Sequence, residues 1–422
     1  MDSINTSKEL NKYSGMVLVF LCGLTFFSVC FVPYFPIADQ LSIRLEDIIL
    51  PFAVFLVLPH YKSIFHWYFL ILIIWGVWGV VTMAVNVRSN VVNDYFELYK
   101  LFKFFVFTLM FALLFKRKTD VFGFISVIFL FLVMFNMMHY FNLFDFNKKV
   151  MPLYCPNSMQ LEYFGRNSLG GVATKRILGT VGNPNINAIL FSFFMVYFIS
   201  FLRRKTWHLG KLYFFISIAM ILYTQSRTSM ASTAIIIALF ILFTKPDKKQ
   251  LLQLSIGITL AFGLVWFSDL YSLQYITGAK WNVEQNGSLR GRLEVWRELL
   301  GMIAKSPIFG YGINKNYFYE HNLFSENEYI LVMWRYGIPG LFFYGVMLFG
   351  WIWDGRKTLL KSFSDESLAY LLAVVMIGFN ALTNNPLSSP MIMVLFAAIT
   401  GFYISNKLET KAKTLNNNKL VS

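Results

Sequence analysis

Long apolar stretches recur along the whole chain, and this feature restricts its possible folds more than any other. A membrane-spanning helix needs about 20 mostly apolar residues, because the hydrocarbon core of a bilayer is about 30 Å thick. The 422 residues are 57% hydrophobic and only 14% charged, whereas soluble domains carry about 25% charged residues. The sequence therefore predicts an all-α, polytopic membrane protein with one integral membrane domain over 1–422.

About twelve stretches are long and apolar enough to cross a bilayer as helices. Two long polar connections, 141–185 and 269–327, interrupt them. The predicted spans are 15–34, 45–60, 64–85, 97–115, 120–140, 186–202, 210–225, 228–244, 251–268, 328–353, 366–383 and 389–406.

The formal net charge of +15 gives the expected orientation. Because Lys and Arg of membrane proteins concentrate in cytoplasmic loops, the positive charge does not indicate nucleic acid as a partner. With both termini in the cytoplasm, every strongly basic short connection falls on the inner side, and the two long loops fall outside. These basic connections are 116–118, 203–205, 245–249 and 356–357.

Sequence motifs for cofactor chemistry are missing. The N-terminus lacks the cleavage site of a secretory signal, so the first span is expected to remain as a helix. Three cysteines give no disulfide framework. We find no CxxC, HExxH, P-loop or GxGxxG in a suitable context, and therefore expect neither a metal nor a nucleotide cofactor.

Charged residues gather just before the tenth predicted span, in the stretch 288–340. As a helix, 291–303 divides into a polar and an apolar side. The polar side carries Arg290, Glu294, Arg297 and Gly301. The apolar side carries Leu293, Trp296, Leu300 and Ile303. Such a helix either turns its guanidinium groups toward an anionic ligand or lies in the membrane interface with a solvated charged face.

Two further arginines stand at the outer ends of predicted spans. Arg176 precedes Asn183-Pro184, a pattern typical of a helix start with Asn183 as N-cap. Free N–H groups beside Arg176 could hold a diphosphate, or the arginine is merely solvated. Arg227, in a tight turn near membrane depth, needs a partner, a bound anion or a lipid phosphate.

In two places, oppositely charged residues are expected to pair with each other. Glu328 and Arg335 are two helical turns apart and would share a face inside the bundle, where they imply a polar cavity. The stretch 44–47, Arg-Leu-Glu-Asp, is interpreted as a local ion pair at a helix entrance.

Three of these pieces together resemble the O-antigen polymerase and O-antigen ligase superfamily, the Wzy-like integral membrane glycosyltransferases. The resemblance covers about 175–350 and rests on these pieces in this order: Arg176-Ile-Leu-Gly-Thr-Val-Gly-Asn-Pro-Asn185, Gln225-Ser-Arg-Thr-Ser229, Gly291-Arg292 with Trp296, Pro307, Gly310 and Gly312, Glu326-Asn-Glu-Tyr329, and Gly337-Ile-Pro-Gly340.

The position of one acidic residue favours a polymerase over a ligase within this superfamily. Ligases typically show His-Asn ahead of the Gly-Ile-Pro-Gly turn, and Glu326-Asn327 occupies that place here, with His321 five residues too early. Polymerases are also described with an Arg-x10-Gly pattern, which Arg290 and Gly301 satisfy.

The resemblance implies an O-antigen polymerase that joins undecaprenyl-diphosphate-linked oligosaccharide units at the periplasmic face of the bacterial inner membrane, with membrane lipid around it. It implies no cofactor, and a chain-length regulator and a flippase as partners. The implied base is Glu326 or His321. The implied diphosphate ligands are Arg176, Arg227, Arg290 and Arg292. Implied supporting residues are Asn185, Asn327, Glu328, Tyr329 and Arg335. The alternatives are a ligase that transfers polymer to lipid A-core, and a lipid-linked oligosaccharide flippase.

Overall fold

The computed structural model describes residues 2–38, 41–60, 68–86, 94–116, 121–155, 176–203, 209–268, 287–321 and 323–421. The middle of the first long loop and the beginning of the second lie outside these ranges. So do parts of the basic connections at 116–118 and 203–205.

The chain is an all-α membrane protein, as predicted, with one short β-hairpin between its first two helices. Its first half contains α1 (Asp2–Phe31), β1 (Phe35–Ala38), β2 (Leu41–Ile43), α2 (Leu45–Val57), η1 (Leu58–His60), α4 (Tyr68–Val85), α5 (Tyr95–Lys116), α6 (Phe122–Phe141), η4 (Leu143–Asp145), α7 (Phe146–Lys149), η5 (Met151–Leu153), η7 (Gly179–Val181) and α9 (Pro184–Phe198). The second half contains η8 (Ile199–Arg203), α10 (Leu209–Thr224), α11 (Arg227–Thr244), α12 (Lys248–Ser268), α14 (Gly287–Lys305), α15 (Lys315–His321), α16 (Glu328–Lys361), α17 (Asp365–Asn380) and α18 (Pro390–Val421).

Every predicted span overlaps one of these helices. By length and composition, seven helices in the described ranges could each cross a membrane alone. They are Tyr95–Phe115, Phe122–Phe141, Pro184–Arg203, Arg227–Thr244, Lys248–Phe267, Glu328–Lys361 and Pro390–Thr410. Shorter apolar helices are Gly15–Phe31, Leu70–Val85 and Leu209–Thr224. The total of about twelve crossings stays a prediction.

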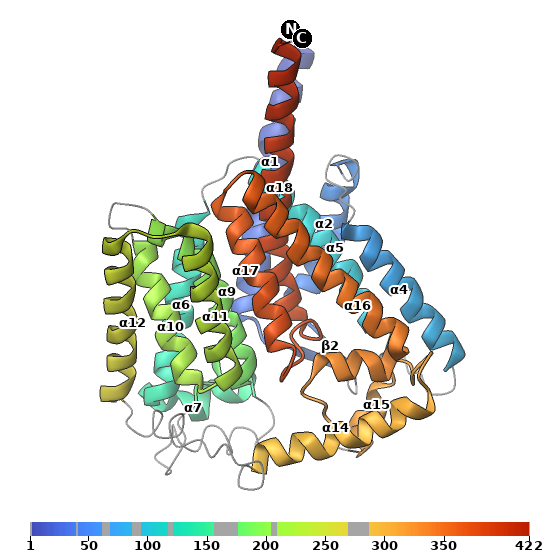
Figure 1. Ribbon diagram of the computed structural model, residues 1–422. Helices are drawn as coiled ribbons and strands as arrows, with labels where there is room; N and C mark the ends of the chain where they lie inside the picture. Colours follow the sequence, from blue (N-terminus) through green and yellow to red (C-terminus); the bar gives the residue numbers. More distant parts are fainter. Residues whose placement is uncertain are drawn as a thin grey trace.

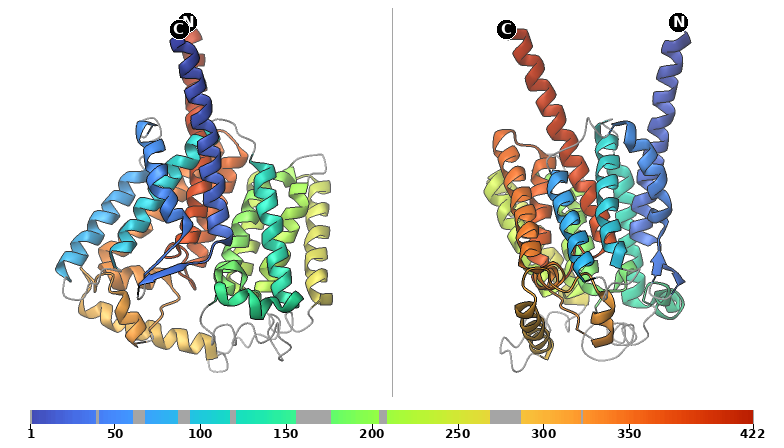
Figure 2. Two further views of the ribbon diagram at one scale, coloured as in Figure 1. Left: turned by 180° about the vertical axis from the view of Figure 1, so that it is seen from behind. Right: turned by 90° about the vertical axis from the view of Figure 1, so that its right-hand side faces the viewer.

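The two ends of the helix bundle differ in what they carry. The helices α1 and α18 extend from the same end, where the turn between α11 and α12 and the turn between α16 and α17 also lie (Figures 1 and 2). The β-hairpin, α7, α14 and α15 lie at the opposite end, and α14 runs across the bundle there (Figure 1). The described parts of both long loops therefore share one end, called the loop end below.

The centre of the bundle is formed by α5 against α18 and by α17, which is almost fully buried. A side chain at Gly401 would place its Cβ 2.7 Å from the Thr108 carbonyl oxygen. This glycine is needed because only a residue without Cβ allows the two backbones to approach so closely.

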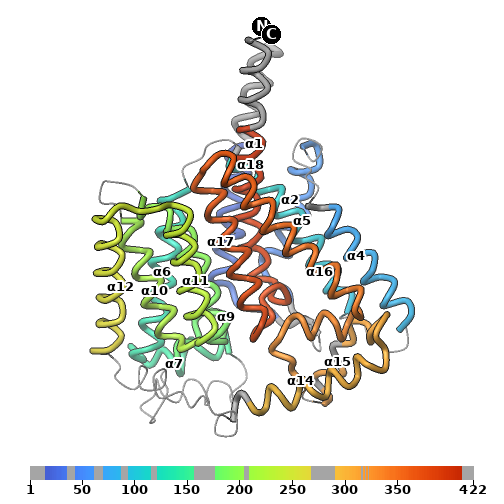
Figure 3. The backbone as a smooth tube through the Cα atoms, in the orientation of Figure 1, coloured from blue at the N-terminus to red at the C-terminus, as the bar shows by residue number. Residues whose placement is uncertain are grey.

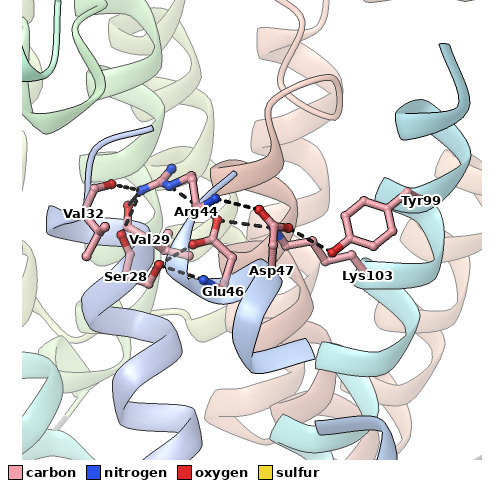
Figure 4. Close-up of polar contacts among 8 residues, drawn as sticks. All are labelled: Ser28, Val29, Val32, Arg44, Glu46, Asp47, Tyr99 and Lys103. Atoms are coloured by element: carbon pink, nitrogen blue, oxygen red, sulfur yellow. Dashed lines mark hydrogen bonds and ion pairs between the residues drawn. The ribbon is translucent and has the colours of Figure 1, made fainter. Parts of the chain in front are cut away.

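A buried ionic network fixes the β-hairpin and α2 to α1 and α5 (Figure 4). Arg44, 2% exposed, donates hydrogen bonds to the Ser28, Val29 and Val32 carbonyls at the end of α1. Lys103 lies 3.3 Å from Glu46 and 2.7 Å from Asp47. The predicted local pair is thus part of a larger cluster with a cation from α5, because a helix entrance without counter-charge could not be buried.

Candidate functional site

A break in α16 organises the loop end. At Gly337 the backbone adopts φ 69° and ψ −174°, so the segment before it runs across the bundle and the rest runs along it (Figure 3). The Ile338 N–H donates to the Pro307 carbonyl at 2.7 Å, and the Tyr311 N–H donates to the Trp334 carbonyl at 2.9 Å. The turn after α14 therefore satisfies backbone groups that the break leaves free.

Two glycines make this close contact possible. Gly310 has φ 61°, and a Cβ there would lie 2.4 Å from the Trp334 carbonyl oxygen. At Gly337, a Cβ would lie 2.0 Å from the Ile308 carbonyl oxygen. Any other residue would meet both a backbone clash and a strained dihedral. Two of the sequence pieces that carry the family resemblance are thus one structural unit.

The helix α14 packs on this unit through a face that differs from the predicted apolar side. Ile303 and Leu299 are buried, with Trp296 partly buried beside them, whereas Leu293 and Leu300 are 38% and 45% exposed. These two leucines of the predicted apolar side therefore take no part in the contact. The buried face is rotated because α14 packs against α15 and the first segment of α16.

Arg292 and Glu326 form an ion pair at the solvent edge of this contact. The Arg292 Nε lies 2.5 Å from Glu326 Oε2, and the two side chains are 26% and 47% exposed. One helical turn along α14, the Trp296 indole N–H donates to the Ser325 carbonyl. Glu326 has φ 42°, an uncommon conformation for a residue with a Cβ. The segment ahead of α16 is therefore held in a defined, strained shape with its carboxylate accessible.

Asn327 and Glu328 connect this segment to the turn after α17. Asn327 caps α16 by accepting a hydrogen bond from the Ile330 N–H at 3.1 Å. Its side-chain amide donates to the Leu382 carbonyl at 3.0 Å. The Glu328 N–H donates to the Ala381 carbonyl at 2.9 Å.

The turn 380–384 also holds the Gln225–Ser229 turn. Ser229 Oγ donates to Asn380 Oδ1 at 2.9 Å, and the Thr228 hydroxyl is hydrogen-bonded to that of Thr383. This turn is a part of the candidate site that the sequence analysis missed. Its run of Thr-Asn-Asn between two apolar helices could have revealed it, because polar residues near membrane depth are costly without a role.

Arg176 reaches the same region from the other side of the Gln225–Ser229 turn. Its Nε donates to the Thr224 carbonyl at 2.8 Å, and its terminal nitrogen donates to Asn185 Oδ1 at 2.8 Å. Asn183 accepts hydrogen bonds from the Asn185 and Ile186 N–H groups, which confirms the predicted N-cap. Hydrogen bonds thus link Arg176 through two turns to Asn327, which adjoins Glu326.

Glu328 lies in a buried polar cluster where the sequence predicted one, but its pairing differs. Its carboxylate accepts hydrogen bonds from the Leu387 N–H at 3.0 Å and the Ser388 hydroxyl at 3.2 Å. Arg335 pairs instead with Glu97 of α5, at 3.7 Å. Glu97 of α5 lies within ion-pair distance of Arg335, whereas the Glu328 carboxylate is held by the segment between α17 and α18.

The space inside this cluster is small. A cavity of about 30 Å³, lined by Glu328, Arg335, Lys100 and Ser388 among others, has room for a water molecule. The Tyr329 hydroxyl donates to the Gly378 carbonyl at 2.7 Å, which ties the same turn of α16 to α17. The cluster therefore holds the start of α16, next to the accessible Glu326, and is too small to be a substrate cavity.

Three further predicted site residues are exposed. Arg290 is on the far face of α14 and forms an exposed pair with Glu294 at 2.8 Å. His321 is exposed, with its ring stacked on that of Tyr317 at a centroid distance of 4.1 Å. Arg227 is exposed as the first residue of α11. No group of three or more His, Cys, Asp or Glu that could hold a metal occurs within the described ranges.

Comparison with known proteins agrees with the resemblance seen in the sequence. Residues 212–345 match the family model described as O-antigen ligase. A search of curated proteins found no match. The matched region begins in α10 and ends inside α16, so it contains Arg227, Arg292, Glu326 and the Gly310–Gly337 contact.

Residues 212–345 are thus similar to the O-antigen ligase family, which is consistent with the O-antigen ligase and polymerase superfamily. Members of this family are glycosyltransferase-like enzymes of bacterial lipopolysaccharide biosynthesis, with lipid-linked glycans as substrates. The superfamily holds both polymerases and ligases, so the choice between them rests on the site residues.

Proposed function

We propose that this protein is an O-antigen polymerase, which joins undecaprenyl-diphosphate-linked oligosaccharide units at the periplasmic face of the inner membrane. The observation that carries the proposal is the accessible Glu326 carboxylate, held beside Arg292 and linked by hydrogen bonds toward Arg176. An acidic residue stands where ligases typically show histidine. The proposed orientation places both termini in the cytoplasm and the loop end in the periplasm.

The reaction needs a stabilised leaving group and a base. The bond between the donor sugar's anomeric carbon and the diphosphate breaks, while the acceptor hydroxyl forms the new glycosidic bond and gives its proton to the base. In this proposal the diphosphate is held by Arg176, Arg227 and Arg292, because guanidinium groups bind phosphate oxygens through paired N–H donors. Arg227 adds the N–H groups at the start of α11.

Glu326 is the proposed base, with His321 as the second candidate. Glu326 is half-exposed and pre-positioned by the strained backbone at its own residue. The His321 Nδ1 lies 3.0 Å from the Tyr317 carbonyl within its own helical turn. Arg290, two residues from Arg292, points to the opposite side of α14 and is assigned no direct contact with the leaving group.

The supporting residues hold the loop end together in this proposal. Asn185 orients Arg176, and Asn327, Glu328 and Tyr329 hold the start of α16 against the end of α17 and the connection from α17 to α18. Arg335 joins α16 to α5. A chain-length regulator and a flippase are the proposed partners, since the reaction consumes units already moved across the membrane.

The test is glycan analysis of cells that lack the gene and are complemented with wild type or Glu326→Ala. A polymerase predicts single repeat units on the lipid core without the gene, and long ladders restored only by wild type. Loss of all surface glycan with polymer accumulating in the periplasm would identify a ligase. Unpolymerised units retained on the cytoplasmic leaflet would identify a flippase.

Matched variants separate chemistry from folding. Loss of one preorganised charged donor costs on the order of 10²–10³ in rate, so Arg292→Ala should yield normally inserted protein without ladders. Arg297→Ala on the exposed side of α14 and Glu320→Ala on α15 are the controls, with the same charge changes. Ladders of wild-type length from both Arg292→Ala and Glu326→Ala would overturn the assigned roles.

A further inference from the structure

An apolar groove runs along the edge of the bundle, far from the loop-end site. The helix α12 is the outermost helix on its side and packs beside α10 (Figure 1). Between α6, α10 and α12 lies a groove of about 510 Å³, whose lining includes Met137, Leu212, Phe215, Ala219 and Leu260. Its walls are almost entirely apolar, so water would fill it poorly.

One lysine of the groove has no counter-charge. Lys211, near the start of α10, lines the groove and is only 3% exposed. Among the described residues, none forms a hydrogen bond or ion pair with its ammonium group. The charged group that acts on it is Lys249 of α12, which is a like charge. An ammonium group at the edge of an apolar groove, beside a like charge and without an anion, favours an anionic ligand at this end of the groove.

The dimensions of the groove suit one lipid chain. It follows α10 from Lys211 to Tyr223, a rise of about 18 Å at about 1.5 Å per residue. One leaflet contributes roughly half of a hydrocarbon core about 30 Å thick. The lysines lie at the same end of the bundle as the termini, where α10 and α12 both begin (Figure 1).

We propose that the groove between α6, α10 and α12 is a binding site for one anionic phospholipid. Its phosphate lies between Lys211 and Lys249, and one acyl chain follows α10 toward Tyr223. Basic pockets between membrane helices are general sites for anionic headgroups. The Phe215 ring packs against Gly257 of α12, and a Cβ at this glycine would lie 2.2 Å from the ring. The lipid fills the space beside this contact.

Native mass spectrometry of the full-length protein in a neutral detergent tests the site. The probes are phosphatidylglycerol and phosphatidylcholine with identical acyl chains. We expect one phosphatidylglycerol on wild type, and about 30-fold weaker binding to Lys211→Gln/Lys249→Gln, since each basic residue adds about fivefold. The control Lys357→Gln/Lys361→Gln removes two exposed charges from α16 at the same end.

A third variant tests the acyl chain separately. Leu260 is 67% exposed and lines the groove, so Leu260→Trp should obstruct it while both lysines remain. Lys211→Gln removes an uncompensated charge and is expected to leave the melting temperature unchanged or higher. Equal retention of the two lipids, equal loss in the α16 control, or full binding by Leu260→Trp would each overturn the proposal.

Discussion

Replacing Gly337 by alanine should disrupt the backbone contact between the break in α16 and the turn after α14. At φ 69° and ψ −174°, a residue with a Cβ is strained by about 2 kcal/mol. The new Cβ would also meet the Ile308 carbonyl oxygen at 2.0 Å, and this backbone atom cannot turn aside.

Relief of that clash moves the turn and weakens two hydrogen bonds. The bonds at risk join Ile338 to Pro307 and Tyr311 to Trp334, and each contributes about 1 kcal/mol. We therefore expect a total loss of about 4 kcal/mol in the free energy of unfolding. This corresponds to a melting temperature lower by roughly 4–5 °C.

The three cysteines provide the assay. Cys22, Cys30 and Cys155 are all buried, and burial raises the pKa of the Cys155 thiol, which keeps it unreactive in the folded state. A thiol-reactive fluorogenic dye will therefore report unfolding of the detergent-solubilised protein. Gly345→Ala, in the same helix with no atom within 4 Å of the added Cβ, is the matched control.

The control should melt at or slightly above wild type, because alanine is favoured over glycine in a helix by up to about 1 kcal/mol. If Gly337→Ala melts within a degree of Gly345→Ala, the argument from close backbone contact is wrong.

Three further changes are predicted, each measured by the same melting assay. Lys103→Met should cost about 3–5 kcal/mol, because it leaves two carboxylates of the Figure 4 network with Arg44 as their remaining cation. Lys149→Met, which breaks an exposed pair, should cost less than about 1 kcal/mol; equal losses would contradict this. Asn380→Ala should lower stability by about 2 kcal/mol through its bonds to Ser229 and Ser232; an unchanged melting point would refute it. Gly301→Ala meets open space and should gain up to about 1 kcal/mol with ladders intact; lost ladders would show that the Arg-x10-Gly pattern is functional.

The helices could be predicted from the sequence because each is encoded locally. An apolar run long enough for a bilayer specifies a helix by itself, and Asn183-Pro184 marks the start of α9 by local hydrogen bonding. The family resemblance likewise came from short pieces that each lie within one turn or helix end.

The pairings between distant segments could not be predicted in this way. Periodicity placed Glu328 and Arg335 on one face, yet it carries no information on the approach of Glu97 from α5. The rotated face of α14 has the same cause, because α15 and α16 decide which side is buried. The partner of Gly310 across the break in α16 is equally invisible to local patterns.

The network around Arg44 constrains how this protein can be assembled in a membrane. The helix α2 has 13 residues, or about 20 Å, and carries Glu46 and Asp47 at its start. Until Lys103 of α5 arrives, α2 is too short and too charged to rest alone in hydrocarbon about 30 Å thick. Biogenesis must therefore keep α1 and α2 near the insertion machinery until α5 has been synthesised, and the three helices enter the lipid as one group.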